Sequence, residues 1–282
     1  MTENEKINNL NGFIQCLSSP VNVENWSNAL YQKLEKSAKD SELLLIKDIP
    51  LVLGRYYQYM PSIQKILRHG VTIMCKGMSE FSRWKNIDSL DEVDHYCYSV
   101  AGVVGEILVF LFAEYSPQIK QKIDKLLPLA VSFGEALQLT NILKDVWEDD
   151  SRGIHWLPMK DLNSCKRSEF TKKYVEIALG HVQHALNFIT EIPRREVGIR
   201  TFCLLANCMS LLTLKNIYVN PNFVNSKDIK ISRSDVKKVV LFSKIVGFSN
   251  SMISYLFKHY SGKNLIPFYR DPVELRKKVS YW

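Results

Sequence analysis

Apolar residues recur along most of the chain at a spacing close to 3.6, in segments of roughly 20–35 residues bounded by proline and glycine. The clearest segment is Ile119–Glu148. Its apolar positions on one side are Ile123, Leu126, Leu127, Ala130, Phe133, Leu137 and Val146. Alternation of apolar and polar residues over strand-length segments is not evident. The pattern predicts an all-α protein, with residues 1–282 forming a single helical domain.

A helix start is encoded at Ser89-Leu90-Asp91-Glu92. Serine followed three residues later by glutamate is the capping-box pattern, in which each side chain satisfies a backbone amide at the start of a helix. We expect this box to open the helix that carries residues 95–112.

Composition narrows the class of protein. The six cysteines are scattered without a CxxC pair, so neither a disulfide framework nor a zinc site is indicated. The N-terminus has no apolar signal segment, and Glu106 interrupts the longest apolar run, residues 100–113, which is shorter than the roughly 20 residues of a membrane span. A cytoplasmic protein without a transmembrane span is therefore expected. The net charge of 37 − 29 = +8 favours an anionic partner: phosphates, an acidic membrane surface or nucleic acid.

Four oxygen-bearing side chains fall on one face of the helix predicted over residues 119–148 and its continuation. Gln138, Asn141, Asp145 and Asp149 are three and four residues apart. Two carboxylates one turn apart can bind Mg²⁺ that also coordinates a substrate phosphate. The alternative interpretation is an exposed, acidic helix end.

Small residues mark a second segment, Tyr96–Glu106. Ala101 and Gly105 are four residues apart, so one helix face offers bare backbone to its neighbour. Close helix packing explains this pattern, and so does an apolar trough for a hydrocarbon with the Tyr96 hydroxyl at its rim.

The remaining candidates are weaker. The histidines show no metal-binding spacing and are expected to be exposed or half-buried; they include His95, His155, His181 and His184. A basic cluster is interpreted as a solvated helix start, with a phosphate contact as the alternative; it comprises Lys230, Arg233, Lys237 and Lys238. Nucleic-acid binding is not supported, because no known module is evident. Phe202-Cys203 belongs either to the core or to a cavity wall.

Taken together, these segments resemble the squalene/phytoene synthase family. Tyr96–Glu106 is similar to its YCxxVAGxVG signature, and Ala136–Pro158 to its second aspartate-rich signature with the basic-Gly-aromatic-x-Pro segment that follows. Further similar segments are Met74–Met78, to the family's MxxGM, and Arg200–Leu204 and Ile229–Ser232, to C-terminal segments of squalene synthases.

The resemblance implies an all-α isoprenoid synthase fold with a central cavity between two aspartate-rich helices. It also implies Mg²⁺-dependent, head-to-head condensation of two farnesyl diphosphates to presqualene diphosphate, which squalene synthases then reduce with NADPH to squalene. Prenyl diphosphate would be the substrate, and a peripheral membrane contact for product release is left open alongside the cytoplasmic location.

Site residues are carried over by position. Tyr96, Asp145 and Asp149 match the catalytic positions, and Asp145, Asp149 and Asn141 match or adjoin the metal ligands. The positions assigned to substrate binding are Gln138, Asn141, Lys144, Ala101, Val104, Gly105 and Phe202. Lys144 stands where many members have arginine, which keeps the charge but loses the bidentate fork.

The sequence also departs from the family pattern. No first aspartate-rich motif precedes Tyr96, and Asn4–Pro20 resembles the segment that follows that motif, so the chain is expected to begin late. Ala206-Asn207 replaces the common Pro-Gln, and Ser232-Arg233-Ser234 departs from the pattern linked with NADPH. NADPH use is therefore left open. The alternatives are a non-catalytic prenyl-diphosphate-binding relative and a phytoene or dehydrosqualene synthase; Phe202-Cys203 and Lys230-Ile231 favour squalene.

Overall fold

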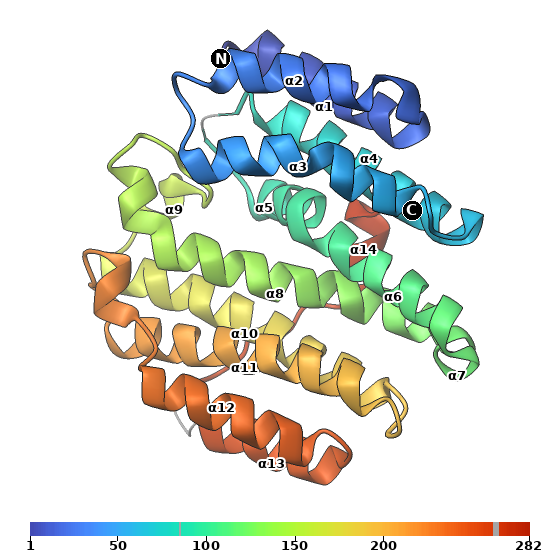
Figure 1. The fold of residues 1–282 in the computed structure, drawn as a ribbon. Coiled ribbons are helices and arrows are strands. Elements are labelled where there is room, and N and C mark those ends of the chain that lie inside the picture. Colours follow the sequence, from blue (N-terminus) through green and yellow to red (C-terminus); the bar gives the residue numbers. More distant parts are fainter. Residues whose placement is uncertain (85, 262–264) are drawn as a thin grey trace. The chain divides into compact units, whose positions relative to one another are not determined.

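The structure, a computed structural model, describes residues 1–84, 86–261 and 265–282. Within these ranges the regular elements are helices, and the only strand-like pairing is an isolated bridge between Asn86 and His155. The all-α prediction is confirmed. The chain divides into two compact units, Met1–Arg83 and Trp84–Trp282, which are described separately (Figure 1). The prediction of a single domain over residues 1–282 stays a prediction.

Unit 1 consists of helices that pack around a small apolar core. The helices are α1 (Glu3–Ser18), α2 (Val23–Leu34), α3 (Asp40–Tyr56) and α4 (Pro61–Phe81), with a 3₁₀ turn at Pro20–Asn22. The buried residues of this core are Cys16, Leu17, Val23, Leu53 and Tyr56. α1 begins with a capping box, in which Thr2 accepts from the Glu5 amide and Glu5 accepts from the Thr2 amide.

Unit 2 is built around α8 (Ile123–Asp150), which contacts α6, α10 and α11. Every residue from Leu126 to Ala136 is buried. The other helices are α5 (Leu90–Cys97), α6 (Val103–Tyr115), α7 (Pro117–Lys120), α9 (Met159–Asn163), α10 (Arg167–Glu191), α11 (Val197–Val219), α12 (Arg233–Val246), α13 (Asn250–Ser261) and α14 (Pro272–Val279), with a 3₁₀ turn at Ser226–Ile229. α8 is thus the central helix of the unit.

Two predicted helix boundaries can be compared directly. The helix expected over Ile119–Glu148 is interrupted, because α7 ends at Lys120 and α8 begins at Ile123 and continues to Asp150. The predicted cap is confirmed at Ser89, whose hydroxyl accepts from the Glu92 amide at 3.2 Å. The Glu92 carboxylate accepts from the Asp88 amide at 2.6 Å, one residue earlier than a standard capping box.

A single π-helical turn, Tyr98–Gly102, joins α5 to α6. Such turns insert one extra residue into an α-helix and often occur at functional sites. The C-terminal segment braces this turn through the buried carboxylate of Glu106, which accepts from the Tyr98 hydroxyl and from Arg276 Nε, each at 2.7 Å, and from Ser280 Oγ. The π turn was not predicted, because 3.6-residue periodicity does not distinguish it.

Glycines allow close contact between the α5–α6 helix and α8. A Cβ atom at Gly134 would lie 2.5 Å from the Ala101 carbonyl oxygen, and one at Gly105 would overlap the Ala130 carbonyl. Both obstacles are backbone atoms and cannot rotate away. The small residues of Tyr96–Glu106 therefore do pack closely, as one of the two interpretations predicted.

Replacing Gly105 with alanine is expected to lower the free energy of unfolding by about 1–3 kcal/mol, as overpacking does. The control is Gly198→Ala on α11, where nothing lies within 4 Å of an added Cβ. At that position alanine restricts the conformations of the unfolded chain, which should raise the free energy of unfolding by about 0.4–1 kcal/mol. Urea unfolding of both variants checks that the two changes in the free energy of unfolding have opposite signs. An equal change in both variants would contradict the close contact between Gly105 and Ala130.

A buried charged cluster ties the segment after α13 to α5 and α8. Arg270 donates two hydrogen bonds to the buried carboxylate of Asp94, at 2.6 and 2.5 Å. Glu135, fully buried on α8, is close enough for its charge to interact with both residues. Burial raises the pKa of Glu135 well above its ordinary value of 4.5, and the Asp94 charge raises it further. Glu135 therefore keeps its proton to a higher pH in the folded protein than in the unfolded chain.

This protonation predicts a pH-dependent effect of Glu135→Gln. Glu135 keeps its proton to a higher pH in the folded chain than in the unfolded chain. Its contribution to the free energy of unfolding of wild type therefore falls by up to about 1.4 kcal/mol per pH unit above pH ~4.5. The variant lacks that loss, so its stability relative to wild type should increase from pH 5 to pH 8. Thermal unfolding at several pH values measures this difference in stability, and the variant Glu114→Gln, at an exposed position, is the control. A constant difference across this range would contradict a raised pKa of Glu135.

Two histidines correct the sequence expectation. His181 and His184 are buried, not exposed or half-buried, and the Nδ1 atom of each lies within hydrogen-bond distance of Ser132 Oγ, at 2.8 and 3.0 Å. Burial lowers the pKa of His181 to about 3, so it is a neutral core residue.

The expectation that no segment could span a membrane is not confirmed. By length and composition alone, three helical segments in the described part of the chain are long and apolar enough: Leu90–Tyr115, Ile123–Asp150 and Val197–Val219. Half of the most apolar window is buried inside the protein in the first and third segments, and 78% in the second.

Candidate functional site

An apolar cavity of about 250 Å³ lies between the α5–α6 helix and helices α8, α10 and α11 of unit 2. Four of the residues assigned to substrate binding are in its wall: Ala101, Val104, Gly105 and Phe202. The rest of the wall is Val100, Leu108, Phe112, Ala130, Phe133, Gly134, Leu137, Phe188, Cys203 and Ala206. The described residues that line it are all uncharged, so this cavity suits a hydrocarbon.

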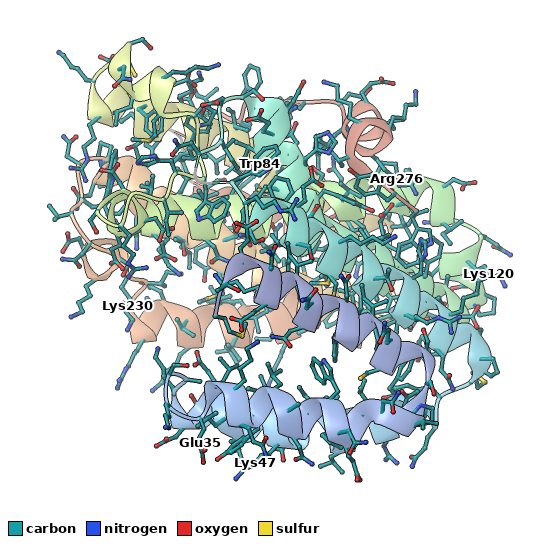
Figure 2. All side chains as sticks on the ribbon, turned by 90° about the horizontal axis from the view of Figure 1, so that it is seen from above. Glu35, Lys47, Trp84, Lys120, Lys230 and Arg276 are labelled. Carbon is teal, nitrogen blue, oxygen red and sulfur yellow. The ribbon has the colours of Figure 1, made fainter. Side chains whose placement is uncertain are left out.

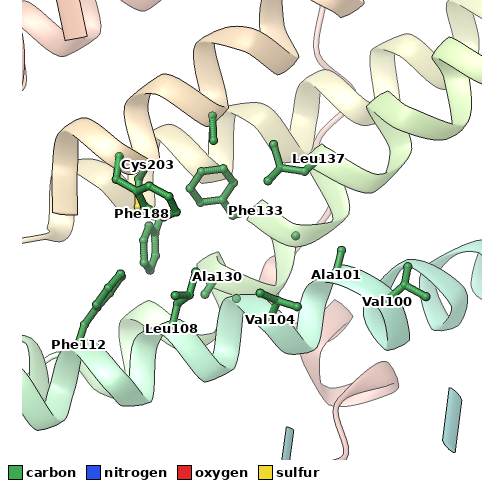
Figure 3. Close-up of a pocket in the computed structure, with 14 residues that line it drawn as sticks. Val100, Ala101, Val104, Leu108, Phe112, Ala130, Phe133, Leu137, Phe188 and Cys203 are labelled. Atoms are coloured by element: carbon green, nitrogen blue, oxygen red, sulfur yellow. The ribbon is translucent and has the colours of Figure 1, made fainter. Parts of the chain in front are cut away.

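The cavity is elongated along the α5–α6 helix. Its wall on that helix extends from Val100 to Phe112, which corresponds to about 18 Å at 1.5 Å per residue. Figure 3 shows Phe112, Phe188 and Cys203 at one end and Val100 and Leu137 at the other. Phe202, the residue before Cys203, is 57% exposed although it lines the cavity.

The face of α8 that lines the cavity becomes polar toward the helix C-terminus. Ala130, Gly134 and Leu137 lie in the cavity wall, and Gln138 is the next residue after Leu137. At 100° per residue, the face continues through Asn141, Asp145 and Asp149. From Gln138 to Asp149 this polar part is about 17 Å long. One helix face thus joins a hydrocarbon pocket to a row of oxygen ligands.

Tyr96 lies where the apolar and polar parts meet. Its ring stacks on Trp156, with ring centroids 4.2 Å apart and planes inclined by 10°. Burial raises the pKa of Tyr96 to about 12; the charges of Cys97 and Asp149 raise it further, and a side-chain hydrogen bond with Gln138 opposes them. Tyr96 is therefore a neutral phenol at physiological pH. The structure places it near Gln138 and Asp149.

The two aspartates are suited to bind a divalent cation. Burial raises the pKa of Asp149, and the neighbouring negative charge of Asp145 raises it further. A cation between the carboxylates would relieve this repulsion, and carboxylate and amide oxygens are the ligands that Mg²⁺ prefers. Asn141, exposed one turn earlier, adds an amide oxygen. Within the described residues, no group of three His, Cys, Asp or Glu side chains could hold a metal. Such an ion would therefore need oxygens from a ligand.

A second, basic hollow of about 510 Å³ lies farther along α8 and α11. Its wall includes Lys144 on α8 and Met209 and Thr213 on α11, all beyond the residues of those helices that line the apolar cavity. Lys227 and Lys230, the latter labelled in Figure 2, also line it. The predicted diphosphate ligand Lys144 therefore has two further lysines near it.

Glu148 positions the basic segment. Its carboxylate accepts from the backbone amide and the hydroxyl of Ser226, at 3.0 and 2.9 Å. These bonds lower the pKa of Glu148 and attach the 3₁₀ turn that carries Lys227 to the end of α8. Lys144 itself lies 3.4 Å from Asp145. Acidic and basic groups are thus adjacent at the polar end of the site.

Several site residues were missed by the sequence analysis. Leu108 and Phe112 continue the four-residue spacing from Val104, a signal that could have identified them. The stacking of Trp156 on Tyr96 and the placement of Lys227 near Lys144 had no local signal, because each joins segments far apart in the sequence.

Known proteins similar to this chain point to one family. Residues 45–235 match the family model described as squalene/phytoene synthase. The squalene synthase of Yarrowia lipolytica is 24% identical over 277 residues, covering 90% of this chain and 59% of that protein. The Botryococcus squalene synthase of Botryococcus braunii is 28% identical over 214 residues, covering 70% of this chain and 45% of that protein. The chain thus spans about half the length of the curated relatives it matches.

Solved structures agree on the fold. TcSQS in complex with the ligand E5700 has a TM-score of 0.72 at 19% identity, covering 99% of this chain and 82% of that one. A dehydrosqualene synthase in complex with ligand has a TM-score of 0.55 at 18% identity, covering 90% of this chain and 87% of that one. The predicted isoprenoid synthase fold is confirmed.

Proposed function

Because the chain belongs to the squalene/phytoene synthase family, we propose that it condenses two farnesyl diphosphates head to head, forming presqualene diphosphate in a Mg²⁺-dependent reaction. Squalene is the proposed final product when NADPH is supplied. We further propose a cytoplasmic enzyme that contacts membranes peripherally.

One observation carries the proposal: a single face of α8 lines an apolar cavity up to Leu137 and then presents Gln138, Asn141, Asp145 and Asp149. A prenyl diphosphate has the same two parts, an apolar chain and an anionic head. The basic hollow that contains Lys144 supports the placement of the head at the polar end, because lysine is a common phosphate ligand.

The residues divide the work according to their chemistry. Asp145, Asp149 and Asn141 would hold Mg²⁺, which when bound neutralises the leaving diphosphate. Lys144 contacts the same anion. Ala101, Val104, Gly105 and Phe202 bind the prenyl chain and exclude water from the allylic cation. One face of Tyr96 is covered by Trp156, so its other face or its hydroxyl stabilises the cation. As a neutral phenol, Tyr96 acts as a hydrogen-bond donor rather than as a phenolate base.

Two alternatives remain as outcomes of the same experiment. One is a prenyl-diphosphate-binding protein without catalysis, and the other is a phytoene or dehydrosqualene synthase, which needs no reductive step. The purified chain is incubated with radiolabelled farnesyl diphosphate and Mg²⁺, with and without NADPH, and the products are separated by chromatography. Geranylgeranyl diphosphate is tested in parallel.

Presqualene diphosphate without NADPH, and squalene with it, would support the proposal. A forty-carbon product or dehydrosqualene would replace it with the corresponding synthase. Binding of farnesyl diphosphate without any product would favour the non-catalytic alternative. The variant Asp145→Asn/Asp149→Asn serves as the blank for contaminating activity.

A further inference from the structure

α12 carries apolar side chains on its outer face as well as on its inner face. Val239, Ser243 and Val246 are buried against the rest of unit 2. On the opposite side, Leu241 is 57% exposed and Ile245 and Phe248 are also exposed. α12 and α13 lie side by side at the edge of unit 2 (Figure 1). Packing of the fold accounts for the inner face only.

Lysines flank this exposed apolar stripe. Lys237, Lys238 and Lys244 fall within about 60° of Leu241 on the helical wheel at 100° per residue, as does Ile245. Phe248 lies in the turn that follows α12 and is exposed as well. We call these six residues the α12 outer face. Asp235 is the only acid between residues 230 and 261, where six lysine and arginine residues give a net charge of 6 − 1 = +5. The segment that contains α12 and α13 is therefore strongly basic, and three of its lysines belong to the α12 outer face.

The C-terminal end of α12 lies against the start of α11 through its inner side. Thr201, the residue before Phe202, donates a hydrogen bond to the Ser243 carbonyl of α12 and packs against Gly247. Phe202 is an exposed residue of the apolar cavity wall. The C-terminal end of α12 thus contacts the residue that precedes this part of the cavity wall.

We propose that the α12 outer face is a docking surface for a lipid bilayer containing anionic headgroups. Leu241, Ile245 and Phe248 enter the interface between headgroups and acyl chains, as the apolar face of an interfacial helix does. The lysines reach anionic headgroups while their alkyl chains stay against apolar surface. A protein partner would not require this concentration of positive charge around the stripe. The proposal rests on the peripheral membrane contact proposed above, to which it assigns a surface, and it is independent of the proposed catalytic function.

Vesicle flotation of the full chain tests the proposal. Wild type is mixed with phosphatidylcholine vesicles or with vesicles containing roughly 30% phosphatidylserine, an anionic lipid of the kind that attracts basic segments. We expect Leu241→Glu/Phe248→Glu to weaken binding to the anionic vesicles by at least about tenfold, because two apolar side chains no longer enter the interface. Lys237→Gln/Lys238→Gln/Lys244→Gln should remove the preference for phosphatidylserine.

The matched control is Val219→Glu/Val224→Glu, which makes the same change in charge at two exposed valines outside the α12 outer face. It should float as wild type does. Circular dichroism establishes that each variant is folded. Absence of wild-type flotation, or equal loss in the control, would overturn the proposal. Light scattering tests the alternative that two copies of the chain associate through this face. That alternative would hold if wild type is a dimer, does not bind vesicles, and becomes a monomer in Leu241→Glu/Phe248→Glu.

Discussion

Replacing Asp149 with asparagine is expected to lower kcat/KM for farnesyl diphosphate by about 10²–10³. Removal of one preorganised electrostatic group at a developing charge costs roughly 3–4 kcal/mol of transition-state stabilisation. Asp145→Asn should have a similar effect. The double variant should lose less than the product of the two single losses, because both carboxylates would hold the same cation. Initial rates at saturating Mg²⁺ measure these effects.

Asp124→Asn is the matched control, since Asp124 is an exposed aspartate in the first turn of the same helix. It should retain wild-type kcat/KM. Calorimetry adds an independent readout: a non-hydrolysable farnesyl diphosphate analogue should bind wild type more weakly after chelation of Mg²⁺, and Asp145→Asn/Asp149→Asn should show little difference. Wild-type activity in both single variants would mean that this face of α8 does not bind the diphosphate.

The helical class and one face of the site could be predicted because both depend on local spacing. Residues three and four apart share a helix face regardless of tertiary structure, so Gln138, Asn141, Asp145 and Asp149 were placed together correctly. The cap at Ser89 was predicted for the same reason. Motif order also identified Ala101 and Phe202, which line one cavity although about 100 residues separate them.

The remainder depends on contacts between segments distant in the sequence. Lys227 comes close to Lys144 because Glu148 binds Ser226, 78 residues away. The π turn at Tyr98–Gly102 is braced by Arg276 and Ser280 through Glu106. The buried histidines were misjudged because a partner such as Ser132, 49 residues from His181, leaves no pattern near the histidine itself.

Arg270 is the strongest example of a contact that the sequence does not announce. It lies 176 residues from Asp94, yet its guanidinium donates to both carboxylate oxygens of that buried residue. Burial opposes the charge on Arg270, but the hydrogen bonds and the charge of Asp94 raise its pKa above the ordinary value. The side chain therefore stays charged and balances the Asp94 carboxylate, whose pKa burial alone would raise further.

Replacing Arg270 with alanine is expected to lower the free energy of unfolding by about 3–5 kcal/mol, because it leaves Asp94 buried without its partner. Urea unfolding followed by circular dichroism measures the loss. Lys278→Ala is the control: Lys278 is also in the C-terminal segment and lies 3.2 Å from Asp91, but both side chains are exposed, so the change should be at most about 1 kcal/mol. Asp94→Leu/Arg270→Met removes both charges together and should recover most of the lost stability, since an apolar pair can replace a buried ion pair. Equal losses in Arg270→Ala and the double variant would mean that Arg270 stabilises the fold through packing rather than by neutralising Asp94.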